Sequence, residues 1–195
     1  VPSAVIFALT FFFTGLFLVS LYQDKNFKGR AFDFAFSNQP KKSFFATLVL
    51  VILLAAAVTT SATVARKFFA FTNFQKALFA FNTKGDIAAT EAGLKKAKSL
   101  SELDIYNRFL AELYLVKINN LFSRNADDLK TDAARAEFQS NFGEAINYAK
   151  RAIELNDSDY QNWVEAGRVY AAVVPLKNAG AYENALSNYN KAREL

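Results

Sequence analysis

The chain has 195 residues, a net charge of +5 and 52% hydrophobic residues, and it contains no Cys, His or Met. Without Cys and His it can form no disulfide, no thiolate or imidazole metal ligand and no histidine base, so acid–base chemistry would depend on carboxylates, Lys or Tyr. We therefore expect no catalytic residue, no cofactor and no metal site in this chain.

Both ends of the chain lack the marks of a natural terminus. There is no Met, and residues 191–195 continue a helical pattern without a cap or a stop signal. These features predict a piece of a longer protein. The alternative is a processed protein that has lost its N-terminal segment.

Residues 1–23 carry no charge and are rich in Phe and Leu. This length matches the ~20 residues with which a helix crosses a ~30 Å hydrocarbon core, so the segment predicts a transmembrane helix. A signal peptide is one alternative, but the segment has no basic start and another apolar run follows it. A buried core helix is the other alternative, and such helices are usually shorter.

The segment 24–42 is a basic loop with five Lys or Arg residues against two Asp residues. Short loops with this bias usually remain in the cytoplasm, which predicts that residues 66–195 lie outside it. Arg66 and Lys67, which directly follow the second span, are also basic. They weaken the difference in charge between the two sides of the membrane. Residues 66–195 hold eighteen basic against sixteen acidic residues. The basic excess is therefore not on a folded face, and we expect no binding of nucleic acid.

Residues 43–65 form a second uncharged run and predict a second transmembrane helix. No Gly or Pro lies between Pro40 and Gly85, so this helix can continue as a stalk to about residue 83. The stalk carries an apolar stripe at helical spacing, formed by Phe71, Phe74, Leu78 and Phe81. The stripe can pack on the following helix or face a membrane surface or a partner.

After a break at Gly85, residues 84–195 predict a domain of helices. Helical patterns cover 87–100, roughly 102–123 and 132–155, with a possible break at Gly143, and a polar loop covers 124–131. The helix over 102–123 is apolar on two sides. Such a helix lies between two neighbours, as interior helices of solenoids do.

The segment Trp163-Val-Glu-Ala-Gly-Arg-Val-Tyr170 matches the W-x2-L-G-x2-Y start of a tetratricopeptide repeat, with Ala where Leu is usual. A 34-residue period counted from the small residues of the preceding helix places the next Trp at position 163. In this family the second helix of each repeat carries the pattern A-x3-F-x2-A. The last helix of the chain follows that pattern with Ala185, Tyr189 and Ala192, after an insertion near 173–178. Residues 140–195 therefore resemble the tetratricopeptide repeat family, and 68–139 resemble diverged members. The repeat-packing residues are Ala145, Ala149, Ala152, Trp163, Ala166, Gly167, Tyr170, Ala185, Tyr189 and Ala192.

The resemblance implies a solenoid of helical hairpins with a groove that binds a protein or peptide. Together with the two uncharged runs, it predicts an all-α fold in which two transmembrane helices precede this solenoid. Gln161, Val164 and Arg168 lie about 130° around the helix from Trp163, so they are the groove candidates. Arg168 could bind a carboxylate. Arg108 and Glu112 are an equivalent pair on the middle helix, roughly 102–123. The alternatives are a solvated face and, for Arg108 and Glu112, an i,i+4 ion pair.

The function predicted from these features is a membrane-anchored module for protein–protein interaction or scaffolding at the cell envelope, in the bacterial inner membrane with its C-terminal domain extracytoplasmic. The lipid bilayer and a protein or peptide are its predicted partners. In layout, two spans before a repeat domain also resemble the C-terminal end of bacterial O-antigen ligases and oligosaccharyltransferase-type glycan transferases. That alternative places the catalytic part upstream of this chain. A spacer that holds another domain away from the bilayer is the third possibility.

Overall fold

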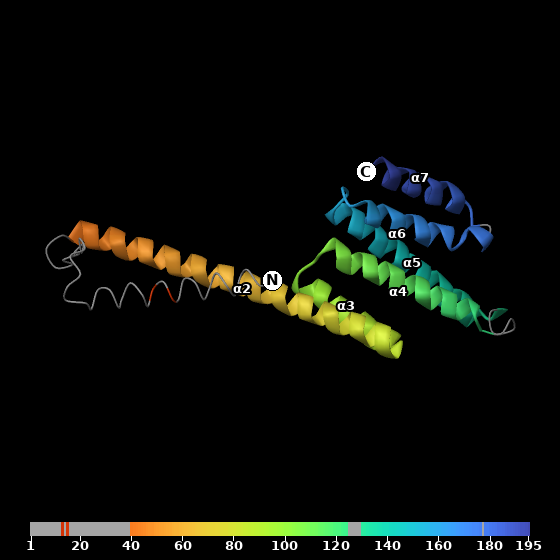
Figure 1. Cartoon of the computed structure of the whole chain (residues 1–195), viewed down its shortest axis with the longest axis horizontal. Helices are drawn as coiled ribbons and strands as arrows, with labels where there is room; N and C mark the ends of the chain where they lie inside the picture. The colour runs from red at the N-terminus through yellow and green to blue at the C-terminus, as the bar shows by residue number, and fades with distance from the viewer. Residues whose placement is uncertain (1–12, 14, 16–39, 125–129, 177) are drawn as a thin grey trace. The chain divides into compact units, whose positions relative to one another are not determined.

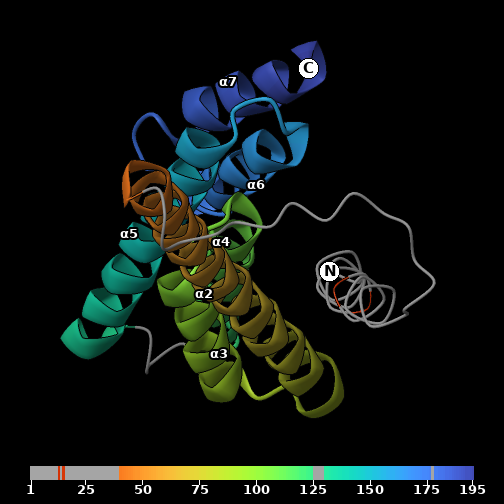
Figure 2. The same cartoon turned by 90° about the vertical axis from the view of Figure 1, so that its left-hand side faces the viewer.

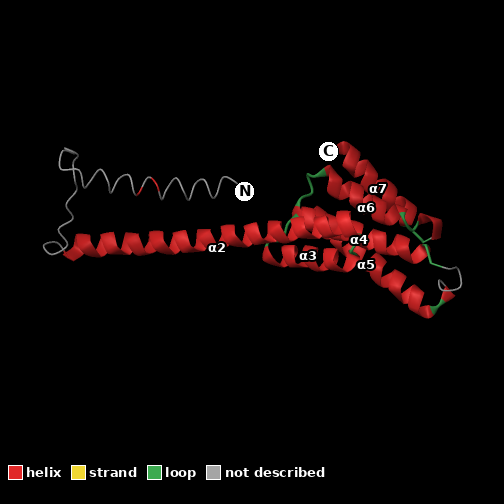
Figure 3. Ribbon diagram, turned by 60° about the horizontal axis from the view of Figure 1, so that its bottom comes forward, coloured by secondary structure: helices red, strands yellow, loops and turns green. Residues whose placement is uncertain are grey.

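The computed structural model describes residues 13, 15, 40–124, 130–176 and 178–195. Every regular element within these residues is a helix, as Figure 3 shows, which confirms the predicted all-α class. The chain divides into two compact units, Val1–Phe68 and Phe69–Leu195.

The long helix α2, Pro40–Lys84, contains the second predicted span. Its section Thr47–Lys84 is long and apolar enough to cross a membrane, with a mean hydropathy of 2.4 in an 18-residue window that is not buried at all inside the protein. It is the one such helix in the described part of the chain. The other predicted span, 1–23, lies outside the described residues except for the helical Phe13 and Gly15, and so does most of the loop 24–42.

Threonine side chains inside the apolar section of α2 satisfy their hydrogen bonds within the helix. The hydroxyls of Thr59, Thr60 and Thr63 donate to carbonyl oxygens one turn earlier, at 3.0, 2.7 and 2.9 Å. A polar group in hydrocarbon needs such a partner, because no water is present to supply one. The section is therefore chemically compatible with a bilayer despite its threonines.

The second unit holds the end of α2 and the remaining helices, which are α3 (Ile87–Leu100), α4 (Asp104–Phe122), α5 (Asp132–Leu155), α6 (Tyr160–Ala171), the short 3-10 helix η2 (Val174–Leu176) and α7 (Ala181–Glu194). Helix α4 packs on α3, α5 and α6, and α6 packs on α4, α5 and α7. Within this unit, Figures 1 and 2 show α6 and α7 together at one end and α3 at the other.

Local sequence signals set several helix boundaries. Helix α2 ends before Gly85, whose φ of 62° is costly for a residue with a side chain. Asp86 and Asp159 begin α3 and α6 by accepting hydrogen bonds from the backbone N–H groups of Ala89 and Gln161, each at 2.9 Å. Helix α5, in contrast, continues without a break through Gly143.

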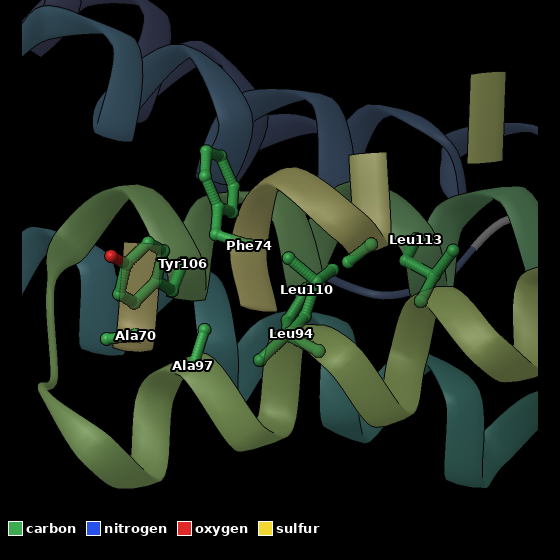
Figure 4. Close-up of a cluster of buried hydrophobic side chains, with 8 residues drawn as sticks. Ala70, Phe74, Leu94, Ala97, Tyr106, Leu110 and Leu113 are labelled. Atoms are coloured by element: carbon green, nitrogen blue, oxygen red, sulfur yellow. The ribbon is translucent and has the colours of Figure 1, made fainter. Parts of the chain in front are cut away.

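The first core cluster joins the end of α2 to α3 and α4, and Figure 4 shows its side chains. The ring of Phe74 lies 5.0 Å from the ring of Tyr106 and 5.2 Å from that of Phe109. Leu78 and Phe81 pack against the same cluster, whereas Phe71 is 40% exposed. Three of the four residues in the predicted stripe therefore pack on neighbouring helices.

A second core cluster lies between α4, α5 and α6. Its buried members are Ala111, Tyr114, Leu115, Ile118, Ala145, Ala149, Ala166 and Val169. Helix α4 contributes to both clusters, because its Leu110 and Leu113 belong to the first. The two apolar sides predicted for this helix thus each have a covering neighbour.

Two glycines offer a matched test of helix packing. A Cβ at Gly93 of α3 would lie 2.8 Å from the Cβ of Ala77 in α2, whereas a Cβ at Gly143 would meet nothing within 4 Å. The methyl of Ala77 cannot rotate away, so Gly93→Ala must push the two helices apart and should lower the free energy of unfolding by about 1–3 kcal/mol. Gly143→Ala should raise it by about 0.5–1 kcal/mol, because Ala favours the helix.

The measurement is thermal unfolding of the full chain in neutral detergent, followed by circular dichroism. Changes of the same sign in the two variants would contradict the close contact between α2 and α3.

Candidate partner-binding face

The groove candidates lie on the two neighbouring helices α4 and α6. We call this surface the α4–α6 face, formed by Arg108, Glu112, Gln161, Val164 and Arg168. Gln161 and Arg168 are exposed, and Val164 is half-buried. Because α4 and α6 are in contact, side chains 49 to 60 positions apart in sequence share one surface.

Arg168 connects the two helices through two carboxylates. Its Nη1 atom donates to Oε2 of Glu165 at 2.8 Å and lies 3.6 Å from Oε1 of Glu112. The side chains of Arg168 and Glu112 are 49% and 41% exposed, whereas that of Glu165 is 4% exposed. The face therefore carries an accessible ion pair above a buried carboxyl group.

Glu165 is a buried acid within this face. Its Oε1 atom has no hydrogen-bond partner among the described residues. Burial raises the pKa of Glu165 to about 7, and Glu112 adds to this rise while Arg168 and Arg108 oppose it. The Glu165 carboxyl is thus close to its midpoint of ionisation at neutral pH.

Arg108 anchors the start of α6 and is the least accessible of the charged groove candidates. Its Nη1 atom donates to Oδ2 of Asp159 at 2.7 Å and to Oδ1 of Asn162 at 2.9 Å, and its side chain is 15% exposed. Arg108 and Glu112 were expected to pair with one another along the helix. Instead, Arg108 takes its acidic partner from the N-cap of α6, and Glu112 lies beside Arg168 of α6.

Asp159 is the N-cap of α6, and its surroundings stabilise its carboxylate. Burial alone would raise the pKa of Asp159, but the hydrogen bonds from Arg108 and from the N–H of Gln161 outweigh burial and lower it. A carboxylate at the start of a helix satisfies free N–H groups and interacts well with the helix dipole. Asp159 therefore helps to hold α4 and α6 together, and it is not itself part of the binding surface.

Asn162 is a buried hub that the sequence pattern did not single out. It is fully buried, and its Nδ2 atom donates to the carbonyl oxygens of Ala152 and Asn156 at 3.2 and 2.8 Å and to Oδ2 of Asp104 at 3.1 Å. Its Oδ1 atom accepts from Arg108. One side chain therefore joins the end of α5, the start of α6 and the start of α4.

The repeat-packing residues lie mainly at helix contacts. Ala145, Ala149, Ala152, Ala166 and Ala185 are buried, and Ala192 is half-buried. A Cβ at Gly167 would lie 2.6 Å from the ring of Tyr189, so the absence of a side chain at Gly167 leaves room for that ring between α6 and α7. Tyr189 of the next helix therefore fills the space beside Gly167.

Trp163 and Tyr170 line a shallow groove instead. The indole N–H of Trp163 donates to the carbonyl oxygen of Asp157 at 2.7 Å, which ties the ring to the turn between α5 and α6. The groove has a volume of about 370 Å³, and its remaining lining residues are Ile146, Ala149, Lys150, Ile153, Glu154, Ala166, Val169, Asn184 and Asn188. It lies between α5, α6 and α7, apart from the groove candidates.

A second polar cluster, which the sequence also did not reveal, joins α3 to α4. Glu91 accepts hydrogen bonds from Lys95 and from the hydroxyl of Tyr114, both at 2.6 Å, and from Lys117. Burial alone would raise the pKa of Glu91, but these hydrogen bonds lower it to about 2. Both lysines and the tyrosine hydroxyl bind the one carboxylate of Glu91, so these groups satisfy one another and we assign the cluster to stability.

Within the described residues, no group of three or more acidic side chains is placed to hold a metal ion. No family model, no curated protein and no solved structure matches the chain.

Proposed function

We propose that the protein is a membrane-anchored helical module that binds a protein or peptide partner through its α4–α6 face. The observation that carries the proposal is the half-exposed pair of Glu112 and Arg168, which comes from two helices in direct contact. The same chain carries an apolar helix section that fits a bilayer. Accessible charges on a fixed helical frame favour recognition over chemistry.

The frame beneath the face supports this role. Arg108, Asp159 and Asn162 hold α4 and α6 together through buried or partly buried hydrogen bonds. Side chains mounted on such a frame lose little conformational freedom when a partner binds. The face is therefore better suited to a specific partner than a loop of similar composition.

We propose further that α4 with α5 and α6 with α7 are successive repeat hairpins of a short solenoid. The contacts of α6 with α4, α5 and α7 support this, because in such a stack the first helices of neighbouring hairpins touch. The basic loop 24–42 supports an extracytoplasmic position for residues 69–195.

The experiment places a photo-crosslinking amino acid at Gln161 or Val164 in the full chain in cells, with Ser187 of α7 as an exposed control outside the α4–α6 face. We expect one defined adduct from positions 161 and 164 and none from position 187. Glu112→Gln and Glu112→Lys should each lower the adduct yield at least ~10-fold, because each removes the accessible carboxylate of the pair.

Circular dichroism of the purified variants shows whether they remain folded. Adducts that form equally from Ser187, or that persist in folded Glu112 variants, would contradict the assignment of the face.

A further inference from the structure

The charges of the α4–α6 face do not balance within the molecule. Glu112 and Glu165 share the single cation of Arg168. Arg108 is not a second free cation, because it forms a 2.7 Å ion pair with Asp159. With both glutamates ionised, the group therefore has one more carboxylate than available cation.

The excess carboxylate is also incompletely bonded. Oε1 of Glu165 is buried without a hydrogen-bond partner, while Oε2 of the same group binds Arg168. The charged groups that face Glu165 are Arg108 and Glu112 from α4 and Arg168 from its own helix, and α7 contributes the Tyr189 hydroxyl. Of the two carboxylates around Arg168, only Glu112 is accessible to another molecule.

We propose that the α4–α6 face binds a basic side chain, Lys or Arg, of its partner, which pairs with Glu112 and leaves Arg168 to Glu165. This inference rests on the proposed function and specifies the chemistry of the partner. An acidic group in the same place would lie beside two carboxylates that already compete for one arginine, and such juxtapositions are unfavourable. A basic group completes two ion pairs from two carboxylates.

Binding of a basic side chain to Glu112 is coupled to the loss of a proton from Glu165. Burial raises the pKa of Glu165 to about 7, with a contribution from Glu112. A cation on Glu112 cancels that contribution and so lowers the pKa of Glu165. A group that loses a proton on binding makes affinity rise with pH, so the basic partner should bind more tightly above pH 7 than below it.

The test uses the full chain in neutral detergent at constant salt, with two fluorescent peptides of alternating Lys–Ser or Glu–Ser as probes, read by fluorescence anisotropy. The Lys–Ser peptide should bind more tightly at pH 8 than at pH 6, by up to about 10-fold, because about a tenth of Glu165 is ionised one unit below its pKa. Glu165→Gln should abolish this pH dependence. Glu112→Gln should weaken binding at pH 8 about 5-fold or more.

Glu183→Gln on α7 makes the same charge change at an exposed position outside the face, and it should leave the affinity unchanged. The inference is overturned if the Glu–Ser peptide binds more tightly, if the Lys–Ser affinity does not depend on pH, or if Glu183→Gln weakens binding as much as Glu112→Gln. In those cases a crosslinked partner at Gln161 and Val164 would still support the proposed function. Loss of that adduct would overturn both.

Discussion

Glu165→Gln is expected to stabilise the protein above pH 7 and to leave its stability nearly unchanged at pH 4.5. The folded-state pKa of Glu165 is about 7, against an ordinary value of 4.5. Below pH 4.5 the carboxyl is neutral in both the folded and the unfolded chain. As pH rises to 7, the unfolded chain loses this proton and the folded chain keeps it, so the free energy of unfolding falls.

The full loss is reached above pH 7 and amounts to about 3 kcal/mol, since each pKa unit corresponds to about 1.4 kcal/mol. Gln at position 165 does not ionise, so the variant should gain most of this amount at pH 8. Thermal unfolding of the full chain in neutral detergent can be followed by the fluorescence of Trp163, the single tryptophan. Glu183→Gln is the matched control and should show no such difference between pH 5 and pH 8.

If the stability of the Glu165→Gln variant depends on pH in the same way as that of the unmodified chain, Glu165 is not a buried acid. The contribution of Glu91 does not interfere, because its pKa of about 2 means that its stabilisation is lost only as pH falls below 4.5. That loss is common to both proteins and cancels in their difference.

Asn162→Ala is expected to lower the free energy of unfolding by about 3 kcal/mol, because it removes a fully buried side chain whose hydrogen bonds join three helices. The carbonyl oxygen of Asn156 and one oxygen of Asp104 lose a donor, and Arg108 loses an acceptor. Urea unfolding of the full chain in neutral detergent, followed by circular dichroism, measures the change.

Gln161→Ala, at the exposed neighbouring position, is the control and should change stability by no more than about 0.5 kcal/mol. Equal losses in the two variants would contradict the role of Asn162 as the hub between α4, α5 and α6. Asn162→Asp distinguishes the hydrogen bonds from the shape of the side chain. It keeps the size but removes the amide donor, so it should also destabilise the protein.

The helical class could be predicted because local chemistry determines it. The break at Gly85 follows from its left-handed backbone, and the start of α6 follows from Asp159 as an N-cap. The possible break at Gly143 was not realised. A single glycine costs a helix only about 1 kcal/mol, and the helix formers around it outweigh that cost.

The buried residues Asn162 and Glu165, which lie next to the α4–α6 face, could not be predicted, because their partners are distant in sequence. Asn162 lies in the first turn of a helix, where Asn is usually solvated, and it meets Asp104 and Arg108 only after folding. Glu165 stands beside the predicted groove residues Val164 and Arg168. Its burial depends on neighbouring helices, which the spacing of the motif does not specify.

The resemblance to O-antigen ligases remains a prediction from layout. Further spans and a long external loop bearing Arg and His upstream of Val1 would favour it. A start codon shortly before Val1 would exclude it.

The central claim is that α2 anchors residues 69–195 to a membrane and that this unit faces outward. Because the chain has no Cys, Ser158→Cys introduces a single thiol at an exposed turn. Intact cells are treated with a membrane-impermeant maleimide, and the labelled chain is then sought in the alkaline-washed membrane pellet. We predict that the label is found there without prior lysis. Label in the supernatant, or label that forms only after lysis, would contradict the claim.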